Sequence, residues 1–154
     1  MGIDLNNALK ISASGMKAQG TRLRVISENI ANQDSVGRTG GADPYRRKTI
    51  VFKDVMDRQL GIDLVQVAKI GRDEGNFKIS YEPYHPLADE KGYIKRPNVN
   101  GLIEMMDMRE AQRTYEANLT VLESSKKMIQ RTICLLYTYP SPRDLATSRM
   151  PAWA

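Results

Sequence analysis

Two heptad patterns near the two ends of the chain constrain its fold more than any other feature. The first alternates spacings of four and three through Leu5, Leu9, Ser12, Met16, Gln19, Leu23, Ile26 and Ile30. The second alternates in the same way through Met105, Met108, Gln112, Tyr115, Leu119, Leu122, Lys126, Ile129 and Ile133. A helix patterned like this has one narrow apolar seam for packing against another helix. The polar members leave each seam imperfect, so this pairing is typical of an assembly unit and not of a catalyst.

The segment between the two helices is predicted to form a small β-rich domain. Short strands are expected at residues 49–52, 64–68 and 76–81, where β-branched and aromatic residues cluster between glycines. A short helical turn is expected at residues 54–59, and prolines and a glycine make residues 83–92 extended and rich in turns. A domain this short, with few large apolar side chains, has marginal stability by itself.

The predicted fold class is therefore α+β. A discontinuous two-helix coiled coil from the N- and C-terminal segments carries the small inserted β-rich domain. The expected segments are residues 1–34 for the first helix, 35–48 for a flexible loop, 49–97 for the β-rich domain and 98–133 for the second helix.

Residues 134–154 do not continue the pattern. They contain Pro140, Pro142 and Pro151 and show no periodicity, and a proline in a helix interior breaks the helix. The stretch that begins at Cys134 resembles a translated sequencing adapter, so residues 134–154 are interpreted as adapter read-through and expected to be disordered. The only cysteine lies at this junction, so the natural part is expected to have no thiol chemistry.

Charge and composition favour no ligand class. The net charge is +5 and aromatic residues make up 6% of the chain. One local basic cluster occurs at residues 46–48, but no aromatic residues are interleaved with it as they are in single-strand nucleic-acid platforms. A mildly basic solvated surface is the simpler interpretation. No apolar run reaches the roughly 18 residues of a membrane span, and no cleaved signal peptide is expected.

Catalytic, cofactor and metal sites are not predicted. His85 is the only histidine, and a lone histidine without clustered cysteines or carboxylates is poor support for a metal site or a general base. No glycine-rich phosphate-binding loop is present. Four carboxylates on the second helix are expected to form ion pairs with Arg109 and Arg113 on a solvated or interface face. They are Glu104, Asp107, Glu110 and Glu116.

Two long stretches resemble the signatures of bacterial flagellar rod and hook proteins. The first runs from Ser12-Ala-Ser-Gly through Ser27-Glu-Asn-Ile-Ala-Asn32, and the second from Asn98-Val-Asn through Arg109-Glu-Ala-Gln-Arg-Thr-Tyr-Glu-Ala-Asn118. Three features narrow the resemblance to the proximal-rod branch: the stretch Gly41–Lys48, the stretch His85–Tyr93 and the short middle domain. One departure is Gly101, where this family often has proline.

The resemblance implies a structural subunit of the proximal rod, which carries motor torque for cell motility. It implies an inner coiled-coil layer, an outer β-rich domain, and export through the flagellar type III apparatus without a cleaved signal. The rod spans the periplasm, and the implied partners are copies of the same chain and FliE, FlgB, FlgF and FlgG. The expected assembly interface is the apolar part of the two seams: Leu5, Leu9, Met16, Leu23, Ile26, Ile30, Met105, Met108, Tyr115, Leu119, Leu122, Ile129 and Ile133.

Two alternatives remain open from the sequence. One is another rod or hook subunit, similar to FlgB or FlgG. The other is a basic coiled-coil adaptor or nucleic-acid-binding protein, whose affinity for DNA would fall steeply with salt. An enzyme is the weakest hypothesis, because no constellation of residues supports one.

The interpretation of residues 134–154 predicts the outcome of resequencing. Independent long reads across codon 134 should replace the codons for residues 134–154 with a different ending, and the heptad seam should continue for about one more helical turn after Ile133. Reads that contain codons 134–154 intact would contradict this interpretation.

Overall fold

The computed structural model describes residues 2–39, 42–59 and 61–137. Within these residues the elements follow one another as helix, four strands and helix. They are α1 (Gly2–Ala31), β1 (Lys48–Asp57), β2 (Ile62–Arg72), β3 (Lys78–Tyr81), β4 (Tyr93–Arg96) and α2 (Gly101–Tyr137). This arrangement confirms the predicted α+β class.

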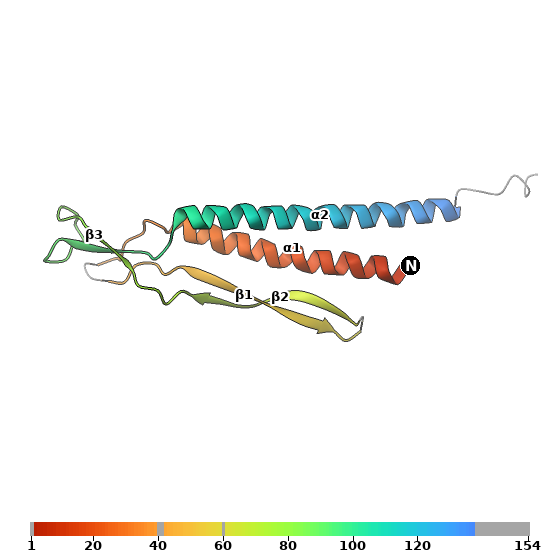
Figure 1. Cartoon of the computed structure of the whole chain (residues 1–154), viewed down its shortest axis with the longest axis horizontal. Helices are drawn as coiled ribbons and strands as arrows, with labels where there is room; N and C mark the ends of the chain where they lie inside the picture. The colour runs from red at the N-terminus through yellow and green to blue at the C-terminus, as the bar shows by residue number, and fades with distance from the viewer. Residues whose placement is uncertain (1, 40–41, 60, 138–154) are drawn as a thin grey trace, which may run out of the picture.

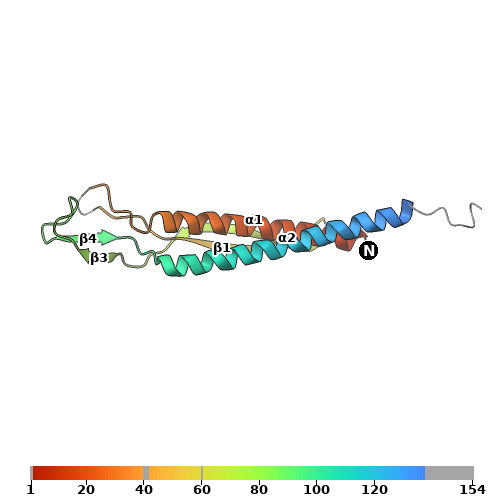
Figure 2. The same ribbon diagram turned by 90° about the horizontal axis from the view of Figure 1, so that it is seen from above.

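The molecule is elongated and layered. α1 lies between α2 on one side and the β1–β2 hairpin on the other, and β3 and β4 extend beyond the ends of both helices (Figure 1). The view from above shows the two helices side by side along most of their length (Figure 2). They are antiparallel, because Asn29 near the end of α1 bonds Glu104 near the start of α2 and Gly15 lies against Asn118.

The two helices touch through small and polar residues. We call these residues the contact line: Gly15, Arg22 and Asn29 on α1, and Glu104, Ala111, Asn118 and Ser125 on α2. They recur every seven residues, and Ala111 is 0% exposed. A Cβ atom at Gly15 would lie 2.8 Å from the Asn118 amide nitrogen, so glycine permits the close approach. The centre of the contact is therefore displaced from the apolar seams that the sequence suggested, although Ser12 and Ile26 of the first seam are also buried.

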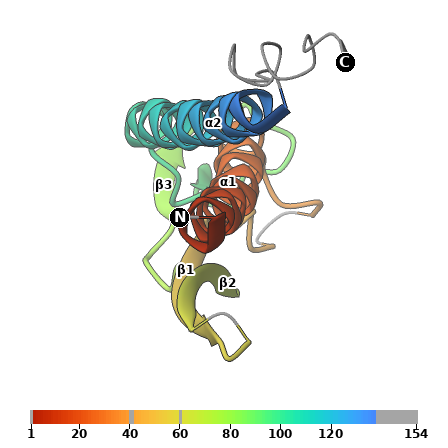
Figure 3. The same cartoon turned by 90° about the vertical axis from the view of Figure 1, so that its right-hand side faces the viewer.

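The β1–β2 hairpin is longer than expected. Its strands pair antiparallel from Lys48 with Arg72 to Asp57 with Ile62, with a bulge between Val51 and Phe52. The predicted helical turn at residues 54–59 is wrong, because residues 54–57 continue β1. Gly61, with φ of 64°, closes the turn, a conformation that glycine adopts readily. Figure 3 shows the hairpin beneath α1, on a different side from α2.

A second, separate two-stranded sheet is formed by β3 and β4. β4 was missed in the sequence, where Tyr93–Arg96 follows a stretch rich in prolines and turns. Gly92 has φ of 77° and turns the chain into β4. The rings of Tyr81 and Tyr93 then meet across the strands, 5.2 Å between centroids and edge to face, a favourable aromatic geometry.

α2 continues to Tyr137 and does not end at Ile133 as expected. No proline occurs between Ile133 and Tyr137, so nothing local ends the helix there. The prolines at 140, 142 and 151 lie outside the described residues. The division of the chain into segments stays a prediction.

The two glycines of α1 should respond differently to alanine. Gly20 has no atom within 4 Å of a new Cβ, so Gly20→Ala should raise the free energy of unfolding by about 1 kcal/mol through helix propensity. Gly15→Ala should raise the free energy of unfolding by less than this, or lower it, because the Asn118 side chain must move. Urea unfolding followed by circular dichroism measures both. An equal gain for the two variants would contradict the close helix contact at Gly15.

Candidate assembly surface and the polar cluster behind it

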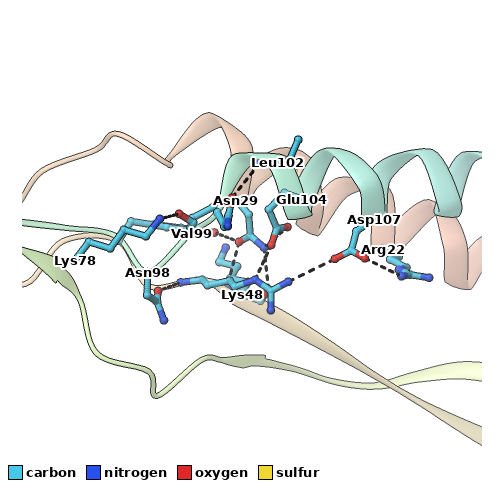
Figure 4. Close-up of polar contacts among 12 residues, drawn as sticks. Arg22, Asn29, Lys48, Lys78, Asn98, Val99, Leu102, Glu104 and Asp107 are labelled. Atoms are coloured by element: carbon cyan, nitrogen blue, oxygen red, sulfur yellow. Dashed lines mark hydrogen bonds and ion pairs between the residues drawn. The ribbon is translucent and has the colours of Figure 1, made fainter.

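Glu104 is the centre of a buried polar cluster at the junction of the two helices. It lies in the first turn of α2 and is 1% exposed, as is Asn29 near the end of α1. Arg47 Nε donates to Glu104 Oε1 at 2.5 Å, and Asn29 Nδ2 donates to Glu104 Oε2 at 3.1 Å. Figure 4 shows Asn29 of α1, Lys48 of β1 and Glu104 of α2 close together, and Arg47 directly precedes β1. The carboxylate therefore joins three distant segments of the chain.

The orientation of the Asn29 amide is fixed by its other hydrogen bonds. Its Nδ2 also donates to the Lys48 carbonyl at 2.9 Å. Its Oδ1 accepts from the Lys48 backbone N–H at 2.9 Å and from the Tyr45 hydroxyl at 2.8 Å. Asn29 thus uses both ends of its amide, and only the nitrogen can face Glu104.

The segment before α2 is held by two asparagines. The backbone N–H of Arg47 donates to Asn98 Oδ1 at 2.9 Å, which ties the start of β1 to this segment. Asn100 Oδ1 accepts from the Leu102 backbone N–H at 3.2 Å, an N-cap of α2. Glu104 then lies in the first helical turn, where the helix dipole favours negative charge.

Ion pairs extend the cluster along the helix contact. Arg47 Nη2 lies 3.6 Å from Asp107 Oδ2, and Arg22 Nη2 lies 3.7 Å from Asp107 Oδ1 and 3.6 Å from Glu110 Oε2. Positive and negative charges therefore alternate between the segments, so each attracts its neighbours across the contact.

A second ion pair ties the start of β1 to α1. Lys48 Nζ lies 2.7 Å from Glu28 Oε2. This hydrogen bond to Lys48 lowers the pKa of Glu28 below its usual value. Burial raises the pKa of the nearby Tyr45 hydroxyl, so that group stays protonated and able to donate to Asn29 at neutral pH.

Two expectations about charge need correction. The basic residues 46–48 are not a solvated patch, because each has a separate internal partner. Arg46 lies over the Phe77 ring at 4.3 Å, Arg47 bonds Glu104, and Lys48 bonds Glu28. Glu104, Asp107 and Glu110 pair with Arg47 and Arg22 across segments, and not with Arg109 and Arg113 along their own helix.

The predicted seams come together on one side of the helix pair. Met16, Leu23 and Ile30 each lie one residue after a member of the contact line of α1, about 100° around the helix, and Leu9 lies seven residues before Met16. Met105 and Leu119 follow members of the contact line of α2 in the same way, and Ile133 lies two heptads after Leu119. Because the helices are antiparallel, the same rotation turns both sets to the same side. We call this side the open face.

The hairpin packs against α1 on the opposite side and, among the described residues, does not contact α2. Ser14, Ala18 and Thr21 line a hollow with Leu64 and Val67 of β2. These α1 residues lie about 60° to 100° from the contact line in the other direction. Within the described part of the chain, no layer covers the open face, and the opposite side of α2 is also uncovered and exposes Ile103, Val121 and Met128.

The predicted interface residues divide by exposure. Ile26 is buried at 5%. Met105, Tyr115, Leu119 and Ile133 are exposed, at 54%, 36%, 38% and 50%. The others are half-buried along the edge of the helix contact: Leu5, Leu9, Met16, Leu23, Ile30, Met108, Leu122 and Ile129. The set is contiguous and partly solvated, and its role as an interface stays a prediction.

The polar cluster was missed as a unit in the sequence. Its members come from the stretches at residues 27–32, 41–48 and 98–104, which also carry the family resemblance. The sequence therefore contained a signal for the cluster in these family stretches. A heptad pattern is defined by apolar residues, so it does not identify a buried glutamate. Lone residues such as Glu104 and Asn29 show their role only when the segments meet.

Residues 2–39, 42–59 and 61–137 contain no cluster of metal-binding side chains and no membrane-spanning helix. No group of three or more histidine, cysteine, aspartate or glutamate side chains there could hold a metal ion. No helix among them is long and apolar enough to cross a membrane. His85 lies in the loop between β3 and β4, and its Nδ1 accepts the Leu87 backbone N–H at 3.2 Å, which is a local structural role.

Known proteins match both ends of the chain. The family model described as "Flagella basal body rod protein" matches residues 9–37, and "Flagellar basal body rod FlgEFG protein C-terminal" matches residues 90–135. The flagellar basal-body rod protein FlgC of Agrobacterium fabrum (strain C58 / ATCC 33970) is 52% identical over 132 residues, 86% of this chain and 95% of that protein. The chain belongs to the FlgC family. FlgC of Borreliella burgdorferi is 39% identical, over 86% of this chain and 97% of the relative. FlgC of Aquifex aeolicus is 38% identical, over 84% of this chain and 96% of the relative.

Membership of the FlgC family makes the chain a structural rod subunit of the flagellar basal body and not an enzyme. The two matched regions contain Asn29 and Glu104, the two buried side chains that join α1 to α2. Tyr45, Arg47 and Lys48, which complete the cluster of this FlgC-family chain, lie between the matched regions.

Replacing the central carboxylate should destabilise the fold. Glu104→Gln keeps the shape but leaves one acceptor facing two donors, Arg47 and the fixed Asn29 amide. The free energy of unfolding should fall by about 2 kcal/mol, since hydrogen bonds to charged groups contribute about 1.5–3 kcal/mol. Urea unfolding measures this. Glu116→Gln, an exposed change of the same charge on the same helix, should stay within about 0.5 kcal/mol. Equal effects would contradict the central role of Glu104.

Proposed function

We propose that this chain is a subunit of the proximal rod and transmits motor torque through a rigid helix pair. The observation that carries the proposal is the open face, an apolar strip along both helices on the side away from the hairpin. Contiguous exposed apolar surface of this kind marks interaction sites in soluble proteins. In a rod, this face would be buried against neighbouring subunits.

The architecture suits a shaft. Two antiparallel helices held by the contact line and by the Glu104 cluster resist bending along their length. A subunit whose surfaces differ on opposite sides can pack head to tail, and such an interface generates a helical filament when the rotation does not close. Stiffness along the axis and contacts on several sides are the mechanical needs of torque transmission.

We propose further that the partners are copies of the same chain and the rod subunits FliE, FlgB, FlgF and FlgG. The proposed location is the rod in the periplasm, reached through the flagellar type III apparatus without a cleaved signal peptide. Family membership supports the rod location in general, and the open face supports several neighbours.

We propose that residues 134–154 play no part in this function. The support is that FlgC of Agrobacterium fabrum aligns over 95% of its own length while 86% of this chain is covered. The family model for the C-terminal region also ends at residue 135. We propose that residues 1–133 carry the function and that a different natural ending continues the heptad seam after Ile133.

A charge on the open face should stop rod assembly without unfolding the subunit. Leu119 is 38% exposed, so Leu119→Asp should leave the circular dichroism of the isolated chain unchanged. In the rod, a buried unpaired carboxylate is strongly unfavourable, so basal bodies should lack the variant and cells should not swim. Leu23→Asp on α1 should also stop assembly and swimming.

Val121→Asp is the matched control, because Val121 is 48% exposed on the same helix and lies about 200° from Leu119. It should impair motility less than Leu119→Asp does. Normal swimming by cells whose only copy carries Leu119→Asp or Leu23→Asp would contradict the open face as an interface.

A further inference from the structure

α1 carries a basic column on the side that faces away from α2. Lys10, Lys17 and Arg24 are exposed and lie seven residues apart. Lys17 and Arg24 follow Gly15 and Arg22 of the contact line by two positions, about 200° around the helix. The column therefore lies on the far side of α1 from α2, along the edge of the hairpin, where Lys17 lines a hollow with Leu64 and Val67 of β2 while remaining exposed.

α2 carries an acidic column in the equivalent place. Glu116 and Glu123 are exposed and also lie seven residues apart. They precede Asn118 and Ser125 of the contact line by two positions, again about 200°. The basic and acidic columns thus lie at opposite outer sides of one helix pair.

These charges have little internal compensation. Among the described residues, the side chains of Lys17, Glu116 and Glu123 form no ion pair. Arg24 Nε lies 4.0 Å from Glu28 Oε1, but Glu28 is bonded by Lys48 at 2.7 Å through its other oxygen. The two columns therefore remain available to charges on another molecule.

The surface beside the basic column is formed by small side chains. Ala13, Gly20 and Ser27 are exposed and lie seven residues apart next to it. A Cβ atom at Gly20 would meet no atom within 4 Å. Small residues in this position let the backbone of a second helix approach closely, as Gly15 does inside the molecule.

We propose that the two columns meet between neighbouring copies of this chain, with α1 of one copy lying antiparallel along the outer side of α2 of the next. The inference rests on the proposed rod function and names one of its interfaces. The columns have opposite sign and the same seven-residue period, which is the electrostatic complementarity that selects a partner and fixes its register. Because they lie on opposite sides of one subunit, the contact repeats head to tail.

The charges also select a register between the copies. Inside one chain, Asn29 of α1 lies at the same height along the helix axis as Glu104 of α2, and Gly15 lies at the same height as Asn118. Neighbours at the same height would therefore place Lys17 opposite Glu116 and Lys10 opposite Glu123, but also Arg24 opposite Arg109, a like-charge contact. An offset of one heptad, about 10 Å, pairs Arg24 with Glu116 and Lys17 with Glu123, and leaves Arg109 opposite Ala31. Neighbours that step along the axis in this way form a helical tube and not a flat ring.

Charge reversal in cells whose only copy is this chain tests the pairing. Lys17→Glu alone and Glu123→Lys alone should each lower incorporation into basal bodies at least about tenfold, because like charges then face each other. The two reversals combined should restore it. Lys17→Glu combined with Glu90→Lys, an exposed change in the β3–β4 loop that restores only net charge, should not. Proteolysis of each purified variant checks that the fold is retained.

Cross-linking provides a second readout that does not depend on motility. In a Cys134→Ser background, Lys17→Cys with Glu123→Cys should give disulfide-linked dimers and longer ladders when assembled rods are oxidised. Failure of the combined reversal to restore incorporation, equal rescue by Glu90→Lys, or absence of cross-links would overturn the proposed interface. If Leu119→Asp still blocks assembly in that case, the rod function stands and only this pairing fails.

Discussion

The structure depends on one buried carboxylate. Glu104 receives hydrogen bonds from Arg47 and from Asn29, and through them it joins the start of α2 to the end of α1 and to the start of β1. A buried charge is tolerated only when it is paired and hydrogen-bonded, so these three segments must come together for any of them to be stable in place. The direction of the hairpin and the register of the two helices both follow from this junction.

The register has a consequence for the surface. Because the helices touch mainly through glycine, alanine and polar residues, most of the larger apolar side chains of the seams are not fully buried inside the molecule. They lie about 100° away, on the open face, where the isolated chain leaves Met105, Leu119 and Ile133 exposed. A polar junction thus holds two helices together while an apolar strip remains for other molecules. Separate polar and apolar surfaces of this kind suit a subunit whose apolar strip is buried only on assembly.

The sequence predicted the long-range features better than the local ones. Heptad spacing located both helices and their pairing. The period is sustained over many residues, so single polar residues or glycines within it do not obscure the pattern. It did not locate the contact line, because the residues there are small or polar and carry no apolar signal. The helical turn at residues 54–59 was wrong because cross-strand pairing with residues 62–65 overrode local preference. The strand at Tyr93–Arg96 was missed because its partner, Lys78–Tyr81, is separated from it by a stretch of turns.

The central claim is that the Glu104 junction holds a helix pair whose open face is buried in the rod. Electron cryo-microscopy of basal bodies from cells whose only copy is this chain tests it most directly. The account predicts density for α1 and α2 in the rod wall, with Arg47 and Asn29 on Glu104 and with Leu23 and Leu119 covered by neighbouring subunits. A rod in which this chain is present but Leu23 and Leu119 face solvent, or in which Glu104 has other partners, would contradict it.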